Sequence, residues 1–357
     1  MKKSSNYRAF NLRTILFFIV LSVCVQAAAQ DKNTAKFKKI VIGTINFIDY
    51  VLNSVDTVFV EDNIYNMTFM PEYSYNYEYY RFRTLSDKPQ SINIAPEGRN
   101  ILKFNLGWRR LIVGYSIDLQ DSRKLTEFNT SLYSTRFALD LYYRKSNEGY
   151  NVKSLTGFYN NGEPLKEHGS YSNIMTIKQI GVGLYYAFNK RFSYAAAYGP
   201  STIQLKSAGS FVLGGGYNQQ EFTMNHEHFD PIVRGQLKDE LGFKKARYDD
   251  FNISFGYAYN WAFAKNFLAG ISLAPAISYK KCNMEFDDRN SLQADINLDF
   301  TTRAALVYNN NIYYVGASLE SHTFCYRRNR LSITNGLGVL ELCVGFNFWK
   351  KKKHTGF

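Results

Sequence analysis

The sequence contains no long hydrophobic run beyond its first 30 residues. No apolar stretch there approaches the roughly 18 residues that a membrane-spanning helix needs. No phosphate-binding loop is present either, because the glycines Gly214–Gly216 do not connect a strand to a helix. These absences argue against a helical membrane protein and against a nucleotide-binding enzyme of the P-loop type.

The chain is also poor in cysteine, with four in 357 residues. Three of them, Cys282, Cys325 and Cys343, lie beyond the N-terminal segment, and their odd number and wide separation do not indicate a disulfide framework. Cys282 and Cys325 both fall at the ends of predicted strands and could pair. None of the three has the spacing of a metal site, and no cofactor is expected.

The first 29 residues have the pattern of a secretory signal peptide. A basic start is followed by an apolar stretch from Ile15 to Val25 and by small residues at Ala27–Ala29, which predicts Gln30 as the first mature residue. A lipoprotein signal ending at Cys24 is the alternative, although the bulky Val23 before it fits such sites poorly.

The net charge of +13 is spread along the chain, and the only dense basic run is 350–353. Such scattered charge indicates attraction to anionic lipid head groups or lipopolysaccharide rather than nucleic acid, and a solvated surface without a partner is the simpler reading. Aromatic residues make up 17% of the chain, which is typical of membrane barrels with aromatic girdles.

The most informative pattern is a strict alternation in residues 251–261. Odd positions such as Phe255 and Tyr257 are large and apolar or aromatic, and even positions such as Ser254 and Gly256 are small or polar. Successive side chains of a strand point to opposite faces, so this strand has one greasy and one polar face. Its length exceeds the usual 5 to 6 residues and suits a tilted membrane strand.

We therefore predict an all-β, antiparallel transmembrane β-barrel of about twelve strands, with a range of ten to fourteen. The last strand ends in the aromatic Phe348, as the signals read by the barrel assembly machinery do. The predicted strands are 67–84, 101–108, 111–119, 134–145, 150–158, 173–188, 191–204, 251–262, 267–280, 294–308, 312–324 and 337–348.

Short connections alternate strictly with long ones along this series. Because bacterial barrels keep short turns on the periplasmic side, strand 191–204 should run outward and strand 251–262 should return. This places 205–250 outside as one large excursion, which could be a hairpin, a plug or further membrane strands.

The chain thus divides into four predicted parts. Residues 1–29 are the signal peptide, 30–66 a partly helical periplasmic lead-in, 67–349 the barrel with its excursion, and 350–357 a basic tail.

Three segments resemble a known family. They are Asp56–Val60, Phe192–Tyr194 and Lys206–Phe211, and they are similar to motifs of secreted Bacteroidetes proteins grouped as domain of unknown function 4421. The resemblance covers most of the mature chain. It implies an outer-membrane location, and since the family has no established activity, it implies no catalytic residues.

Charged residues of both signs occupy the same alternate positions of the strands as the small residues, so they should face the lumen. We expect them to form opposite-sign clusters, either as a structural network or as a solute-selective lining. They are Asp118, Arg136, Asp140, Arg144, Asp299, Arg303, Glu320, His322 and Glu341.

Two other arrangements could carry chemistry. Ser321 and His322 are adjacent and point to opposite faces, so a lipid-facing dyad would have to use Ser318 or Ser332 instead. His226 and His228 would share a face of a strand and could bind a metal together with Asp230 or Glu221, although a solvated loop is the simpler reading.

Three functions remain open at this point. The first is a non-enzymatic outer-membrane barrel, acting as a narrow channel, a transport component or an envelope component. The second is a barrel enzyme acting on lipid or lipopolysaccharide. The third is a surface-binding barrel that meets an external ligand through 205–250. The expected partners are outer-membrane lipid, lipopolysaccharide and the barrel assembly machinery.

Overall fold

The computed structural model describes residues 54–108, 111–119, 125–165, 171–199, 201–328 and 330–351. The predicted signal peptide, residues 30–53 of the lead-in and residues 352–357 of the tail lie outside the described residues. Within the described ranges, no helix is both long enough and apolar enough to span a membrane.

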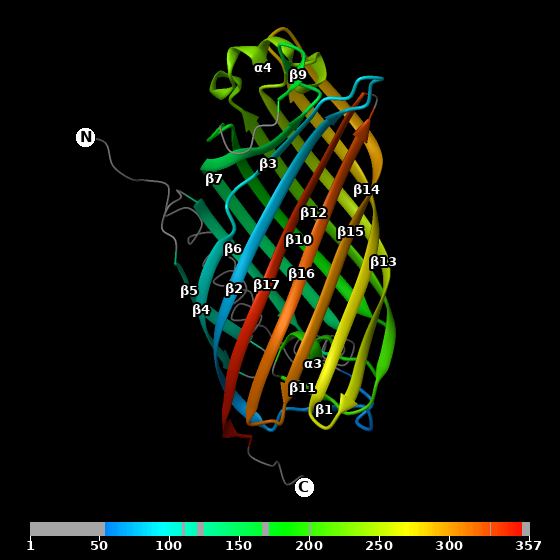
Figure 1. The fold of residues 1–357 in the computed structure, drawn as a ribbon. Coiled ribbons are helices and arrows are strands. Elements are labelled where there is room, and N and C mark those ends of the chain that lie inside the picture. Colours follow the sequence, from blue (N-terminus) through cyan, green and yellow to red (C-terminus); the bar gives the residue numbers. More distant parts are fainter. Residues whose placement is uncertain are drawn as a thin grey trace, which may run out of the picture. The chain divides into compact units, whose positions relative to one another are not determined.

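Ten antiparallel strands form a closed ring, in which the last strand pairs with the first (Figure 1). This confirms the prediction of an all-β antiparallel barrel. In ring order the strands are β2 (Tyr65–Thr84), β3 (Ser91–Ala95), β7 (Phe137–Thr156), β10 (Met175–Ala187), β12 (Ala208–Met224), β13 (Lys245–Ala264), β14 (Phe267–Glu285), β15 (Asn290–Asn309), β16 (Tyr313–Arg328) and β17 (Leu331–Lys350).

Three further strands widen one half of the wall. They are β4 (Arg99–Trp108), β5 (Leu111–Asp118) and β6 (Leu125–Tyr133). In one half of the barrel β3 pairs with both β2 and β7. In the other half β4 pairs with β2, β5 with β4, and β6 with β7, while β5 and β6 do not pair with each other within the described residues.

Two predicted strands, 134–145 and 150–158, are one continuous strand. The polar residues between them resemble a turn but form an irregularity in β7, where Gly149 has a φ of 91° and the pairing with β10 shifts register. Residues 125–133, which were predicted to lie in a loop, form β6.

The expectation that 205–250 is one excursion is wrong, because 208–224 form the wall strand β12 between β10 and β13. The glycines Gly214–Gly216 interrupt the alternation of large and small residues, so this strand was not predicted. A Cβ on Gly214 would lie 2.6 Å from the Tyr185 ring, and a Cβ on Gly216 would lie 2.8 Å from the Val182 carbonyl oxygen, so close packing requires glycine there. Only 225–244 stand beyond the strands; we call this segment the cap.

The prediction of a wall strand at 191–204 is also wrong. These residues fold into helix α3 (Tyr194–Tyr198) and strand β11 (Thr202–Gln204), which pairs with β1 (Val60–Asp62). Ser193 caps the helix by accepting a hydrogen bond from Ala196 N, and three consecutive alanines favour it. We call 54–64 and 189–207 the plug; α3, β11 and β1 lie at the lower end of Figure 1.

The outer wall carries a broad apolar belt. On β13 every odd residue from Phe251 to Phe263 is at least 40% exposed, and on β14 the same holds for Phe267, Ile271, Leu273, Ile277 and Tyr279. Such a stretch covers roughly 40 Å of strand, or about 28 Å of bilayer at the usual tilt of about 45°. Toward the cap, charged residues such as Arg247 and Lys281 replace the apolar ones on the outer face.

The interior is apolar at both ends. Near the cap, buried aromatic residues fill the lumen, with Tyr80, Phe82, Phe222 and Phe243 in mutual edge or tilted contact. Near the plug, the alanines of α3 pack against apolar residues of the wall such as Leu268 and Val307. Polar and charged side chains occupy the layer between these two clusters.

Candidate functional site

Arg303 on β15 lies at the middle of the lumen, and only 1% of its surface is exposed. Its Nη2 atom forms ion pairs with Asp140 of β7 and with Glu320 of β16, at 2.9 Å from Glu320 Oε1. The guanidinium group also stacks over the ring of Tyr185, 4.5 Å from its centroid. A single buried cation therefore joins three strands.

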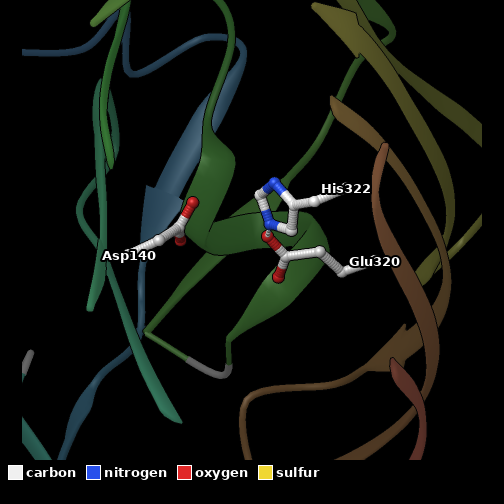
Figure 2. Close-up of side chains that lie close together, drawn as sticks. All are labelled: Asp140, Glu320 and His322. Atoms are coloured by element: carbon white, nitrogen blue, oxygen red, sulfur yellow. Dashed lines mark hydrogen bonds and ion pairs between the residues drawn. The ribbon is translucent and has the colours of Figure 1, made fainter. Parts of the chain in front are cut away.

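His322 extends this cluster on β16 (Figure 2). Its Nε2 atom lies 2.8 Å from Glu320 Oε1, and its Nδ1 atom lies 3.1 Å from Thr301 Oγ1. Tyr185 Oη lies 3.3 Å from the same threonine oxygen, so the tyrosine, threonine, histidine and glutamate form a continuous chain of polar contacts. We call Asp140, Arg303, Glu320 and His322 the central cluster.

The ligand atoms of the central cluster are close enough together to bind a metal ion, but their negative charge is already neutralised. One ligand atom from each of Asp140, Glu320 and His322 lies within 4.8 Å of the others. However, Arg303 is bound to both carboxylates and already supplies the cation that they need. A divalent ion would have to displace a buried guanidinium group, so these residues do not fit a metal.

Three other ion-pair groups occupy the lumen. Lys280 lies 3.3 Å from Asp250 and 2.7 Å from Asp299. Lys103 lies 2.7 Å from Glu72 and 2.8 Å from Glu341, and Arg144 lies 3.0 Å from Glu78. In each group the signs alternate, and within the described residues no ring of one sign lines the lumen.

The structure distributes the nine predicted lumen residues unequally. Asp140, Arg303, Glu320 and His322 lie together. Asp299, Arg144 and Glu341 lie in the separate groups above, and Asp118 pairs with Arg99 at 2.7 Å. Arg136 lies at the plug end of the lumen instead: it donates to the carbonyl groups of Ala187 and Phe188 and to Ser54 Oγ of the plug.

At least six charged lumen residues were not predicted from the sequence: Glu72, Glu78, Arg99, Lys103, Asp250 and Lys280. Strand parity could have found at least three. Glu72 and Glu78 share the parity of the buried Ser74 and Asn76, and Lys280 continues the even-numbered inner face of β14.

The residues considered for catalysis or metal binding do not converge. Ser318 donates to Glu341 Oε2, at 3.1 Å, whereas His322 contacts Glu320 and Thr301 inside the barrel. His226 and His228 lie in a 3-10 helix, where i and i+2 do not share a face, and they contact different carbonyl groups. Cys282 and Cys325 are free thiols, so the predicted option of pairing is wrong.

Little space is left in the middle of the lumen. A cavity between Asp140, Tyr185, Ser254 and His322 measures about 30 Å³, and another beside Lys280 and Tyr326 measures about 10 Å³. Volumes of this size hold about one or two water molecules. A larger hollow of about 490 Å³ is lined mainly by outward side chains such as Leu306, Val315 and Leu342, so it belongs to the outer wall.

The cap closes the opposite end from the plug. It contains η1 (His226–His228), α4 (Pro231–Gln236) and η2 (Asp239–Leu241), and it buries Phe229, Val233 and Leu241 on the aromatic core. The Gln236 side chain exchanges two hydrogen bonds with the backbone of Tyr159, at 3.0 and 2.7 Å. Gln90 similarly bonds to Gln236 O and Lys238 N.

Comparison with solved structures finds barrels of the outer-membrane type. The outer membrane protease OmpT of Escherichia coli is 8% identical, with 82% of this chain and 100% of that chain covered and a TM-score of 0.41. The translocator domain of the autotransporter NalP of Neisseria meningitidis is 7% identical, with 91% and 98% covered and a TM-score of 0.33. Ail, the attachment invasion locus protein of Yersinia pestis, is 9% identical, with 76% and 97% covered and a TM-score of 0.20.

No curated protein matches the sequence. Residues 54–348 match a protein family described as Domain of unknown function (DUF4421). The match spans the plug, the cap and the ring as far as Phe348 in β17. The chain belongs to this family.

Proposed function

We propose that this protein is an outer-membrane barrel that does not conduct solutes and that presents its ordered cap at the cell surface. The observation that carries the proposal is the filled lumen. The plug, the ion-paired middle layer and the aromatic core follow one another along the barrel, and two cavities in the middle layer measure only about 30 and 10 Å³.

The apolar belt supports a membrane location. Contiguous exposed apolar surface of this extent is unfavourable in water and is expected where the wall meets hydrocarbon. The belt ends near Phe251 and Tyr279, although β13 and β14 continue to Lys245 and Glu285. The strands therefore extend beyond the belt, and the aromatic core there supports the cap.

The ion pairs argue against a selective pore. A buried charge is stable only when it is paired, and breaking one such pair costs several kcal/mol. Moving Arg303 aside to open a path would leave Asp140 and Glu320 without their cation. A structural network inside a closed barrel is the simplest role for these residues.

Reconstitution in planar bilayers tests the proposal. The purified protein should show no discrete conductance steps, whereas a porin in the same bilayer should show them. Protease protection and heat-modifiable mobility would establish that the protein has inserted. Reproducible steps from the inserted wild-type protein would overturn the closed-barrel reading and favour a channel.

A further inference from the structure

The outer face of the wall carries a pair of lysines where the apolar belt ends. Lys145 on β7 and Lys178 on β10 are directly opposite each other in the antiparallel register, and both are exposed. Side chains in such positions have Cβ atoms about 5 Å apart, and like charges there are destabilising. The barrel thus maintains an unfavourable cross-strand pair on its surface.

Among the described residues, the nearby acidic side chains form no ion pair with these lysines. Glu221, opposite Lys178 on β12, is bound by Lys245 at 3.1 Å. Asp249 accepts hydrogen bonds from Tyr217 and Gln219 at 2.9 and 2.6 Å. In the described part of the chain, neither Lys145 nor Lys178 has an ion pair, so both ammonium groups are available to an external anion.

An apolar surface lies directly below the pair. Toward the plug, the same two strands place Tyr143 beside Ile180, Leu141 beside Val182, and Leu139 beside Leu184. Ile180 and Leu184 are more than 40% exposed on this face. A ligand that binds both the lysine pair and the apolar surface has an anionic head group and hydrocarbon chains. These chains are about as long as three or four rows of side chains.

We propose that Lys145 and Lys178 bind a phosphate group of lipopolysaccharide, whose acyl chains lie on the β7–β10 wall below them. The site rests on the proposed function, because the lysines lie on the cap side of the belt and would face the outer leaflet. Lysine is a common phosphate ligand, and two ammonium groups on adjacent strands can hold one phosphate between them. Binding would also remove the repulsion within the pair.

The test compares lipopolysaccharide retained by five purified proteins, measured by native mass spectrometry after detergent exchange. The proteins are the wild type, Lys145→Gln, Lys178→Gln and the double variant, and Lys265→Gln in the exposed turn at the plug end is the matched control. Each single change should weaken retention about fivefold and the double change about 25-fold. The control should retain as much as the wild type.

Three results would overturn the site. The double variant could retain as much lipopolysaccharide as Lys265→Gln, enzymatically dephosphorylated lipopolysaccharide could bind as well as the intact form, or phosphatidylglycerol could displace it at equal concentration. Heat-modifiable electrophoretic mobility, which reports whether the barrel is folded, distinguishes a failure of this site from a failure of the proposed function. A folded, inserted barrel with unchanged retention overturns only the site, whereas a protein that does not insert overturns both.

Discussion

Arg303 on β15 and Asp140 on β7 form an ion pair across the lumen, although 163 positions separate them in the sequence. In the ring, β10, β12, β13 and β14 lie between these strands on one side, and β16, β17, β2 and β3 on the other. The pair therefore joins opposite walls, and it braces the barrel from inside.

Removing this brace should destabilise the protein strongly. Arg303→Met leaves Asp140 buried without its cation, which typically costs about 3–5 kcal/mol. Urea unfolding in detergent micelles would measure the loss. Arg191→Met, which breaks the exposed pair with Asp56, should cost less than about 1 kcal/mol. The double variant Arg303→Met/Asp140→Leu should recover much of the stability, and a double variant no better than Arg303→Met would contradict the assigned pairing.

Removing Arg303 should also create a metal site. Without the guanidinium group, Asp140, Glu320 and His322 present three ligand atoms within 4.8 Å of one another and carry net negative charge. We expect Zn²⁺ to raise the thermal midpoint of Arg303→Ala but not of the wild type. Adding His322→Ala to the variant should abolish the shift. An equal shift in the wild type would show that Arg303 does not occupy the cation position.

The apolar belt predicts where a charge blocks insertion. Phe255 is 58% exposed on the outer face, so Phe255→Lys should disfavour insertion by about 2–4 kcal/mol if the site lies near the bilayer centre. Thr223→Lys, on the exposed face of β12 near the cap, should be nearly neutral. Folding into vesicles of defined composition, followed by heat-modifiable mobility, compares the two. Equal insertion of the two variants would show that the apolar belt has been assigned to the wrong part of the wall.

Sidedness follows from the cap and the short turns. In a background without Cys282, Cys325 and Cys343, Glu227→Cys in the cap should react with an impermeant maleimide in intact cells. Lys265→Cys, in the turn between β13 and β14, should react only after the cells are broken. Both positions are exposed, so accessibility within the folded protein does not bias the comparison. The reverse labelling pattern would show that the barrel has the opposite orientation in the membrane.

The cap should loosen in mild acid. Burial lowers the pKa of His226 below its usual value of 6.5, despite an opposing contact with the Leu241 carbonyl group. The released histidine takes up a proton more readily than the buried one, so the closed cap is fully stable above pH 6.5 and loses stability below it. Hydrogen exchange of 225–244 should therefore accelerate between pH 7 and pH 5.5. His226→Gln should flatten this dependence; an unchanged profile would assign it to another group.

The apolar outer face of the wall was predictable because it follows a local rule. Phe251, Ile253 and Phe255 are exposed on that face regardless of which strand is their neighbour, so the alternation is visible in the sequence itself. The same rule fails at Phe192 and Tyr194, which alternate with small residues as wall residues do. Both belong to the plug and are buried against the inner face of the wall, and only the tertiary structure reveals this.

The candidate site was predictable in one respect only. Strand parity identifies Asp140, Arg303 and Glu320 as inward-facing, but it does not say which of them meet. Their contacts depend on the order of strands around the ring, and β12 was missing from the predicted order. The pairing of Lys145 with Lys178 was not predicted for a different reason: 134–145 and 150–158 were predicted as two strands, whereas β7 is one strand that pairs with β10.

Pairing of β17 with β2 closes the ring, from Leu331 beside Thr84 to Lys350 beside Tyr65. The two strands lie near opposite ends of the described chain, so loop-closure entropy opposes this contact more than the pairing of successive strands. Until the twenty residues of β17 are available for pairing, each intermediate has two open sheet edges that can pair with other chains. A protein truncated before Leu331 should therefore aggregate or be degraded in the periplasm instead of assembling as a smaller barrel.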